Sequence, residues 1–330
     1  MLRHMKAGFR KLRKHKKTLL LLYLGNLTAA LLLAVPFMEV FEDSLGAGLY
    51  RERLEGSLDY EWYRLFQERT SGFASTFSPA VIGVGPFVQQ LERLLDGELA
   101  ELPAGILMLG GLYLLAHSFL MAAALGSLVL DPGGTTTREF FRTGAVLFGR
   151  FFRLSLLGLV CLWLLDRWVI DPSEGWVAER ADAALTDRSA FYWRFSRYPL
   201  LLVLFLNLNM VLDYSKIKTA LEDRTSVLLA FLSALRFCLG RWASSFGLYL
   251  LLTGVGIAGA AAYVSLDGRL PQQTGITILI AFLLQQTYML FRLSVKLLFY
   301  SVQTEFYLAT EFPPADAGKR FPRAGLPGPR

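Results

Sequence analysis

The sequence predicts an all-α integral membrane protein. Its six transmembrane helices form three hairpin-like repeats, each preceded by a cytoplasmic amphipathic elbow helix. Three observations predict this. Hydrophobic residues make up 54% of the 330 residues, which is too apolar for an ordinary soluble domain. Six apolar runs are long enough to cross a hydrocarbon core about 30 Å thick. Basic residues are concentrated in alternate connections between these runs.

The six predicted spans are residues 18–38, 104–128, 154–170, 198–215, 243–265 and 274–300. Helix is the expected conformation, because lipid cannot satisfy open backbone polar groups. The third span is the shortest apolar run and ends at Asp166-Arg167. It carries Trp163 and Trp168, which are typical of a membrane interface. Pro199 and Gly275 stand at the second position of the fourth and sixth spans, and no Pro or Gly interrupts the rest of either span, unlike the broken helices of many transporters.

The N-terminal block, residues 1–17, has eight basic residues and no acidic one. A basic block is also a feature of nucleic-acid binding, but no interleaved aromatic platform accompanies this one. Because it adjoins an apolar run, it predicts membrane orientation and no nucleic-acid partner. The apolar run is long and lacks a small-x-small site, so a cleavable signal peptide is not expected.

The connections between spans predict the topology. Segments 131–153 and 216–241 are rich in Arg and Lys, whereas 39–103 is acidic and 171–197 mixes both signs. Positive connections remain on the cytoplasmic side. Both termini are therefore expected in the cytoplasm.

The first outer loop, 39–103, is the largest predicted segment outside the membrane. It contains "LDYEWYRLFQER" at 58–69 and "PFVQQLERLLDG" at 86–97, which both read as amphipathic helices. Between them, the apolar stretch 78–87 either packs against these helices or dips into the outer interface. The loop is also a candidate surface for protein partners.

The domain organisation predicted from these patterns is a six-span domain over 1–310 and a tail over 311–330. The tail holds five prolines and three glycines and is expected to be disordered in the cytoplasm.

Two segments resemble copies of one another. "REFFRTGAVLFGRFFRLSLLGL" begins at Arg138 and "LLAFLSALRFCLGRWASSFGLYL" begins at Leu228, with Gly149-Arg150-Phe151 over Gly240-Arg241-Trp242. Each amphipathic stretch runs into an Arg and then into a span, and the N-terminal block follows the same plan. Such elbows bury an apolar face at the headgroups and offer cations to anionic lipid. The predicted headgroup contacts are Arg138, Arg142, Arg150 and Arg241, although the elbows are equally consistent with simple anchors.

The elbows, the paired spans and the segment "LDYSKIKTALEDRTSVLLAFLSALRF" (212–237) give the chain a family resemblance. It resembles bacterial six-span membrane families of unknown function, including those similar to the membrane domain attached to some glycerophosphodiester phosphodiesterases. The resemblance covers about 105–310, and the long first outer loop departs from the pattern. It implies the fold and a bacterial inner-membrane location, and it transfers no catalytic residue.

Motifs for catalysis, metals or cofactors are missing from the sequence. No HExxH, GxSxG, Walker A or CxxC occurs, and the two cysteines, Cys161 and Cys238, offer no disulfide framework. "GVGIAG" at 254–259 lies inside a span, so a dinucleotide site is not predicted. Gly254, Ala258 and Ala262 instead repeat every four residues, and this stripe of small residues predicts close packing of two spans. No catalytic residue, metal or cofactor is therefore predicted.

Polar residues inside the spans are the remaining candidates for function. Asn26 and His117 fall mid-span, and His117 is expected to face inward, in a structural hydrogen bond or as a ligand or proton relay. A larger polar cluster is predicted between the fourth and sixth spans; its members are Asn207, Asn209, Asp213, Gln285, Gln286, Arg292 and Lys296.

Depth estimates predict how this cluster is arranged. At 1.5 Å per residue, Asp213 lies about 22 Å along its span and Arg292 about 24 Å along its own. An Asp213–Arg292 ion pair is preferred, with Lys296 one turn further in. Asn207 and Gln286 are expected to hydrogen-bond at mid-depth.

Two functional interpretations follow. In the first, the cluster is a static clasp, and the chain is a non-catalytic scaffold or membrane subunit of an envelope assembly. In the second, the cluster lines a polar cavity, and the chain is a transporter or lipid-handling permease. A third interpretation is a sensor whose outer loop binds a ligand. The sequence does not identify the substrate, the partners or the oligomeric state.

Overall fold

The computed structural model describes residues 2–45, 60–70, 104–130, 136–270 and 274–312. All regular secondary structure in these ranges is helical, as predicted. Five helical stretches are long and apolar enough to cross a membrane: Gly110–Val129, Thr137–Asp182, Asp187–Leu221, Trp242–Asp267 and Gly275–Glu311. By this criterion the chain is an all-helical, multi-pass membrane protein.

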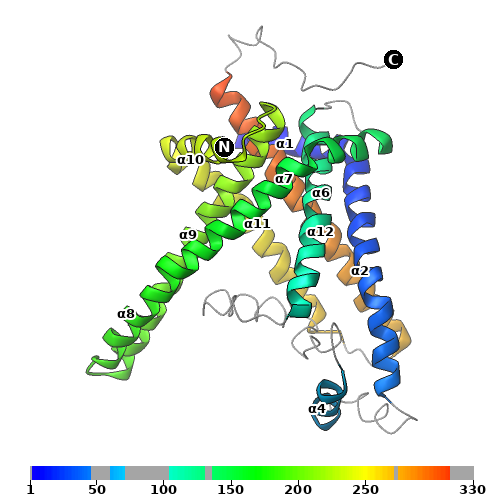
Figure 1. Cartoon of the computed structure of the whole chain (residues 1–330), viewed down its shortest axis with the longest axis vertical. Helices are drawn as coiled ribbons and strands as arrows, with labels where there is room; N and C mark the ends of the chain where they lie inside the picture. The colour runs from blue at the N-terminus through cyan, green and yellow to red at the C-terminus, as the bar shows by residue number, and fades with distance from the viewer. Residues whose placement is uncertain (1, 46–59, 71–103, 131–135, 271–273, 313–330) are drawn as a thin grey trace. The chain divides into compact units, whose positions relative to one another are not determined.

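The described helices follow one another along the chain (Figure 1). They are α1 (Leu2–Lys14), α2 (Lys16–Ser44), α4 (Tyr60–Arg69), α6 (Ala104–Leu130), α7 (Thr137–Leu165), the π-helical turn η4 (Asp166–Ile170), α8 (Asp171–Asp182), α9 (Asp187–Leu221), α10 (Val227–Gly240), α11 (Trp242–Asp267) and α12 (Gly275–Glu311). The first predicted span falls in α2, which is not among the five stretches above. A sixth span therefore stays a prediction.

The connection predicted at 171–197 is helical, which corrects the sequence analysis. The chain is helical from α7 through η4 and α8, and α9 begins eleven residues before the predicted fourth span. The reason is local pairing of the charges that suggested a loop. Arg167 pairs with Asp171 one turn later at 3.2 Å, and Arg197 of α9 pairs with Glu174 of α8 at 3.4 Å. Because α9 starts earlier, Pro199 lies inside it.

The chain divides into two compact units, each of which is described by itself. The first unit contains Met1–Gly25, His117–Leu162 and Leu202–Arg330, and the second contains Asn26–Ala116 and Trp163–Leu201. Most of the buried apolar residues belong to one cluster in the first unit, contributed by the helices from α1 to α12 that enter it.

Helix α12 packs most closely against α1 and α11 in the first unit. Glycines make both approaches possible. A Cβ at Gly8 of α1 would overlap Val302, and one at Gly259 of α11 would overlap Phe291. The predicted small-residue stripe is not the contact, because a Cβ at Gly254 would meet nothing within 4 Å. The close packing of "GVGIAG" therefore uses its last glycine, on another face of the helix.

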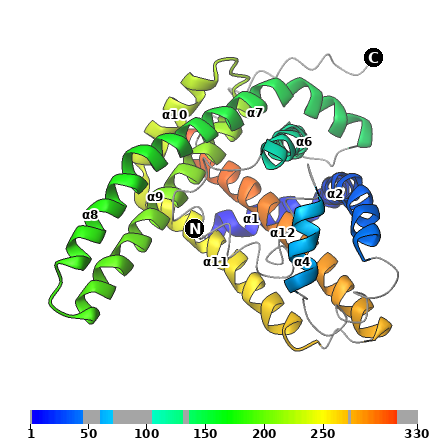
Figure 2. The ribbon, with the colours of Figure 1, turned by 60° about the horizontal axis from the view of Figure 1, so that its bottom comes forward.

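Two of the three predicted elbows are separate helices. One residue separates α1 from α2, and Arg241 separates α10 from α11 with φ −136° and ψ 35°. The middle elbow is not separate: residues from Thr137 onward run without a break into the span as α7. Figures 1 and 2 both draw α7 as a single curved ribbon. The structural repeat of elbow and span therefore stays a prediction.

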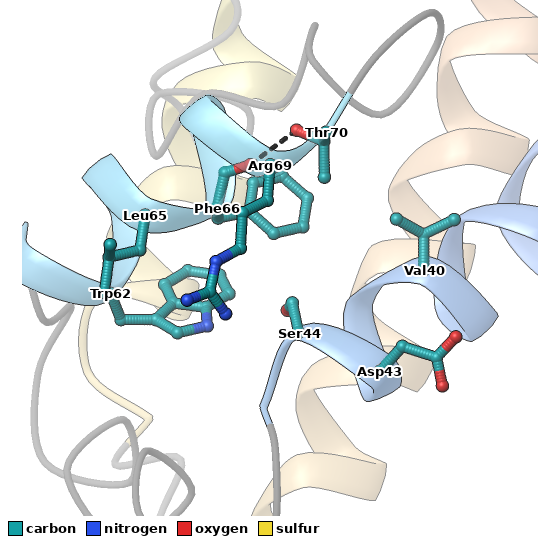
Figure 3. Close-up of a pocket in the computed structure, with 8 residues that line it drawn as sticks. All are labelled: Val40, Asp43, Ser44, Trp62, Leu65, Phe66, Arg69 and Thr70. Atoms are coloured by element: carbon teal, nitrogen blue, oxygen red, sulfur yellow. Dashed lines mark hydrogen bonds between the residues drawn. The ribbon is translucent and has the colours of Figure 1, made fainter.

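The second unit contains the described part of the predicted outer loop. Helix α4 confirms the amphipathic helix predicted at 58–69, and its Trp62 and Phe66 pack against Phe41 near the end of α2. The two helices enclose a cavity of about 230 Å³ (Figure 3). Three predictions lie outside the described residues. They are the apolar stretch at 78–87, the amphipathic helix at 86–97 and the disordered tail from residue 313 onward.

Candidate functional site

An ion pair between α9 and α12 forms the centre of the candidate site. The Lys296 Nζ donates to both carboxylate oxygens of Asp213, at 3.0 and 3.3 Å. The Asp213 side chain is 4% exposed and that of Lys296 is 36% exposed. The ammonium also lies 4.8 Å from the centroid of the Tyr300 ring, a cation–π contact. For a buried carboxylate of this kind, the paired cation offsets part of the cost of removing the charge from water.

The predicted partner of Asp213 was wrong by one turn. Arg292 is exposed, and its guanidinium lies 6.0 Å from the centroid of the Tyr288 ring. The depth estimate counted residues from assumed helix starts near 198 and 276, whereas α9 starts at Asp187. An error of one helical turn in relative depth is enough to exchange Arg292 for Lys296.

Buried hydroxyl groups accompany the ion pair. Tyr214 follows Asp213 on α9, Tyr300 follows Lys296 by one turn on α12, and α11 contributes Ser245 and Tyr249. All four are buried. Within the described part of the chain, the Tyr300 hydroxyl has no hydrogen-bond partner, whereas the Tyr214 and Ser245 hydroxyls lie within interaction range of each other. The sequence analysis missed these residues, although Tyr214 directly follows Asp213 and Tyr300 lies one turn after Lys296.

The amides of α9 bond elsewhere. Asn207 donates to the Val203 carbonyl at 2.8 Å and accepts from the Trp242 indole N–H at 2.9 Å. Asn209 donates to the carbonyl of Phe205 at 2.9 Å. The predicted hydrogen bond between Asn207 and Gln286 is therefore absent. The Trp242 bond ties α9 to the start of α11.

The glutamines of α12 also take no part in the Asp213–Lys296 ion pair. Gln286 accepts a hydrogen bond from the Tyr23 hydroxyl of α2 at 2.8 Å, and Gln285 is exposed. Of the seven residues predicted to form one cluster, Asp213 and Lys296 are the two that the described structure joins by a hydrogen bond or ion pair. Asn209 and Arg292 share a helix face with Asp213 and Lys296 but lie one turn earlier, and Asn207, Gln285 and Gln286 lie still further from the pair along their helices.

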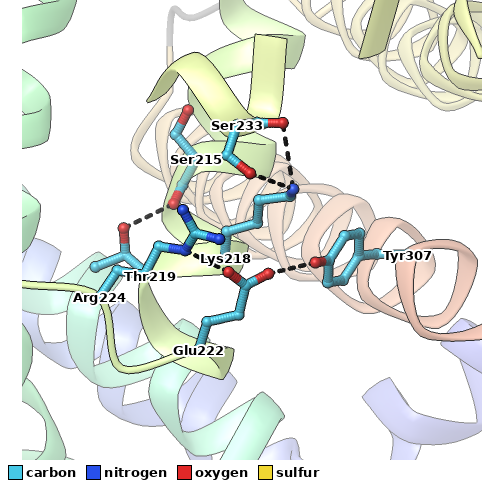
Figure 4. A network of polar contacts seen from close by, with 7 residues as sticks. All are labelled: Ser215, Lys218, Thr219, Glu222, Arg224, Ser233 and Tyr307. Atoms are coloured by element: carbon cyan, nitrogen blue, oxygen red, sulfur yellow. Dashed lines mark hydrogen bonds and ion pairs between the residues drawn. The ribbon is translucent and has the colours of Figure 1, made fainter. Parts of the chain in front are cut away.

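A second polar centre lies at the turn that follows α9 (Figure 4). Lys218 is buried, and its ammonium donates to the Ser233 carbonyl at 3.2 Å and to its hydroxyl at 2.8 Å. The same ammonium lies 5.5 Å from the Phe237 ring centroid and 5.1 Å from that of Tyr307. These contacts join α9, α10 and α12.

Glu222 completes this second centre. It accepts a hydrogen bond from the Tyr307 hydroxyl and pairs with Arg224. The next residue, Asp223, pairs with Arg150 of α7 and has φ 49°. A positive φ is uncommon for a non-glycine residue, although Asp adopts it more readily than most. The turn is therefore held by the Arg150 guanidinium of α7 and the Tyr307 hydroxyl of α12.

Helices α9 and α12 are thus connected at two levels. Asp213 and Glu222 are nine residues apart on α9, and their partners Lys296 and Tyr307 are eleven residues apart on α12. These separations are about 14 and 16 Å along the respective axes. Both residue numbers increase in the same direction, so the two helices run parallel here.

The predicted headgroup arginines have different surroundings. Arg138 and Arg142 are exposed on α7. Arg150 is engaged by Asp223, and Arg241 is exposed with its guanidinium 5.9 Å from the Phe237 ring centroid. Three of the four are therefore available to an external anion, and Arg150 is part of the turn.

The two mid-span residues lie in different units. His117 is half-buried in the first unit, within electrostatic range of Lys216, Lys296 and Asp213. Asn26 is half-buried in the second unit.

The thiol nearest the second centre is inert. Cys238 of α10 is 1% exposed, and burial raises the pKa of its thiol to about 12, against a smaller opposite effect of Lys218. Within the described ranges, no group of three or more His, Cys, Asp or Glu side chains could hold a metal ion. The arrangement can bind helices together and can orient hydroxyl groups. In comparisons with known proteins, no family model, no curated protein and no solved structure matches this chain.

Proposed function

We propose that this chain is a non-catalytic scaffold, or the membrane subunit of an envelope assembly, in a bacterial inner membrane. The observation that carries the proposal is the double connection between α9 and α12. The Asp213–Lys296 ion pair and the Tyr307–Glu222 hydrogen bond fix both the register and the direction of these helices. A structure fixed in this way is suited to presenting constant surfaces to partners.

The ion pair fits a static role in its own geometry. Asp213 is buried and both its oxygens receive the Lys296 ammonium. Separating such a pair would leave a charge without a partner in an apolar medium, which is strongly unfavourable. A clasp uses that penalty to hold one conformation.

Complementation of a deletion strain tests the scaffold directly. The strain would receive wild-type protein or a double variant, Asp213→Leu with Lys296→Leu, at matched membrane levels. A scaffold needs the helices connected but not the charges, so the double variant is expected to restore the phenotype. The Arg292→Leu variant is the control for removal of a nearby exposed cation. Failure of a folded, normally abundant double variant would contradict the scaffold.

A transporter or lipid-handling permease is the second candidate, and one observation favours it. The hydroxyl of Tyr300 is buried beside the ion pair with no hydrogen-bond partner among the described residues. Such groups are rare and are often satisfied by water or a bound solute. In this case Asp213→Asn would abolish function while leaving expression intact.

The proposed membrane topology places both termini in the cytoplasm, in agreement with the basic connections. Its partners are anionic lipids at Arg138, Arg142 and Arg241, and proteins through the outer segment 39–103. Reporter fusions at residues 70 and 220 are expected on opposite sides of the membrane. Finding both on one side would contradict this topology.

A further inference from the structure

One face of α12 is polar over three turns, and four of its five side chains are buried. Lys296, Tyr300, Gln303, Thr304 and Tyr307 recur at helical spacing, so their side chains share one sector of the helix. The last four are 0, 1, 1 and 2% exposed. Apolar side chains would be expected on such a face in an ordinary helix bundle.

Three of the five side chains on this face have polar atoms without a hydrogen-bond partner. Within the part of the chain that the structure describes, no hydrogen bond reaches the Tyr300 hydroxyl, the Thr304 hydroxyl or either polar atom of the Gln303 amide. Three other hydroxyls of α12 behave differently: those of Thr287, Ser294 and Thr310 each donate to the carbonyl four residues earlier, at 2.8, 2.8 and 2.6 Å. Thr304 does not use this local solution. The buried Ser301 hydroxyl, next to Tyr300 in the sequence, is also without a partner among the described residues.

Both ends of the polar face lie against charged groups. At one end Lys296 pairs with Asp213, and at the other Tyr307 donates to Glu222. Glu222 also pairs with Arg224, whose side chain is 38% exposed. The face therefore runs from a charge pair within the helices to a turn that reaches the surface of the first unit.

Unpaired buried polar atoms are uncommon, and a group of them in one place calls for a partner that is small and can both donate and accept. Water has this chemistry, and buried waters make about three hydrogen bonds to such groups. We propose that ordered water molecules line this face of α12 and connect the Asp213–Lys296 pair with the solvent at the Glu222 turn. The inference is independent of whether the protein is a scaffold or a permease.

Hydroxyl-radical footprinting of the unmodified protein in nanodiscs tests the presence of this water. Radicals generated from bound water modify adjacent side chains even where bulk solvent does not reach. After correction for intrinsic reactivity, Tyr300 is expected to be modified several-fold faster than Phe140 and Phe151, which are equally buried in apolar surroundings. Equal rates at the three rings would overturn the proposal.

Cysteine labelling tests the connection to solvent. In a background with Cys161→Ser and Cys238→Ala, Thr304→Cys is compared with Val302→Cys, an equally buried apolar position on the same helix. A small hydrophilic methanethiosulfonate is applied to the face that exposes residue 224. Labelling at 304 is expected to be roughly tenfold faster, because a thiol without water cannot ionise readily. Equal slow labelling would overturn the connection, and footprinting decides alone if either variant fails to fold.

Discussion

The Lys296 ammonium lies 3.0 and 3.3 Å from the two carboxylate oxygens of Asp213, and Arg292, one turn earlier on the same helix, is exposed and takes no part. The structure thus distinguishes Lys296 from Arg292, although the sequence alone makes either of them a suitable partner for Asp213. Arg292 is also a matched control for each experiment on the clasp, because its removal takes a charge of the same sign from the same helix.

Removal of Lys296 is expected to destabilise the protein. Lys296→Met leaves Asp213 buried without a cation, which costs about 3 kcal/mol of unfolding free energy. Arg292→Met should change stability by less than about 0.5 kcal/mol, as for other exposed positions. Thermal unfolding in nanodiscs would measure both. Equal losses would show that the pair has no special role.

Loss of the Tyr307 hydroxyl is expected to weaken the turn after α9. Tyr307→Phe removes the hydrogen bond to the Glu222 carboxylate, and bonds to charged groups contribute about 1.5–3 kcal/mol. Tyr288→Phe is the control, since Tyr288 stacks on Tyr263 at 4.4 Å between ring centroids and the stacking survives the change. Urea or SDS titration compares the two. A larger effect at 288 would contradict the structure.

The glycines of α11 are expected to differ in their tolerance of a methyl group. Gly259→Ala brings a Cβ into Phe291, and overpacking of this kind costs about 1–3 kcal/mol. Gly254→Ala meets open space and should stabilise the helix by up to about 1 kcal/mol. Melting temperatures of the two variants should therefore move in opposite directions. A fall at 254 alone would mean that α11 packs through the other face.

Cys238 is expected to resist maleimide until the protein unfolds. With a pKa of about 12, only about one thousandth of the thiol is ionised at pH 9. In a Cys161→Ser variant, labelling of the folded protein should stay slow between pH 7 and pH 9, while the denatured chain labels rapidly. Fast labelling of the folded protein at pH 7 would contradict the burial of α10.

Much of the fold follows from the sequence because apolar length and charge are strong signals in membrane proteins. The structure confirms helices at all six predicted spans, of which the last five are long and apolar enough to cross a membrane, and a helix at 58–69. The helix boundaries at 171–197 were missed because the charged residues there were interpreted as a loop. In the structure, Arg167, Glu174 and Arg197 form ion pairs along and between helices. A hydropathy scale does not detect such ion pairs.

The candidate site could be predicted only in part. Asp213 and the sixth span were identified, because a carboxylate in an apolar helix needs a cation. Choosing Lys296 over Arg292 required the rotation and depth of both helices, which no residue pattern contains. Gln303 and Thr304 were missed because they lie beyond residue 300, where the predicted span ended.

The central claim is that the Asp213–Lys296 pair is a clasp, and a double-mutant cycle on unfolding free energy tests it most directly. Asp213→Leu and Lys296→Met are measured singly and together, in nanodiscs at neutral pH. The clasp predicts that each single change is strongly destabilising and that the double variant regains most of the loss, since replacing both charges by apolar groups leaves none unpaired. Additive losses, with the double variant least stable of all, would contradict it.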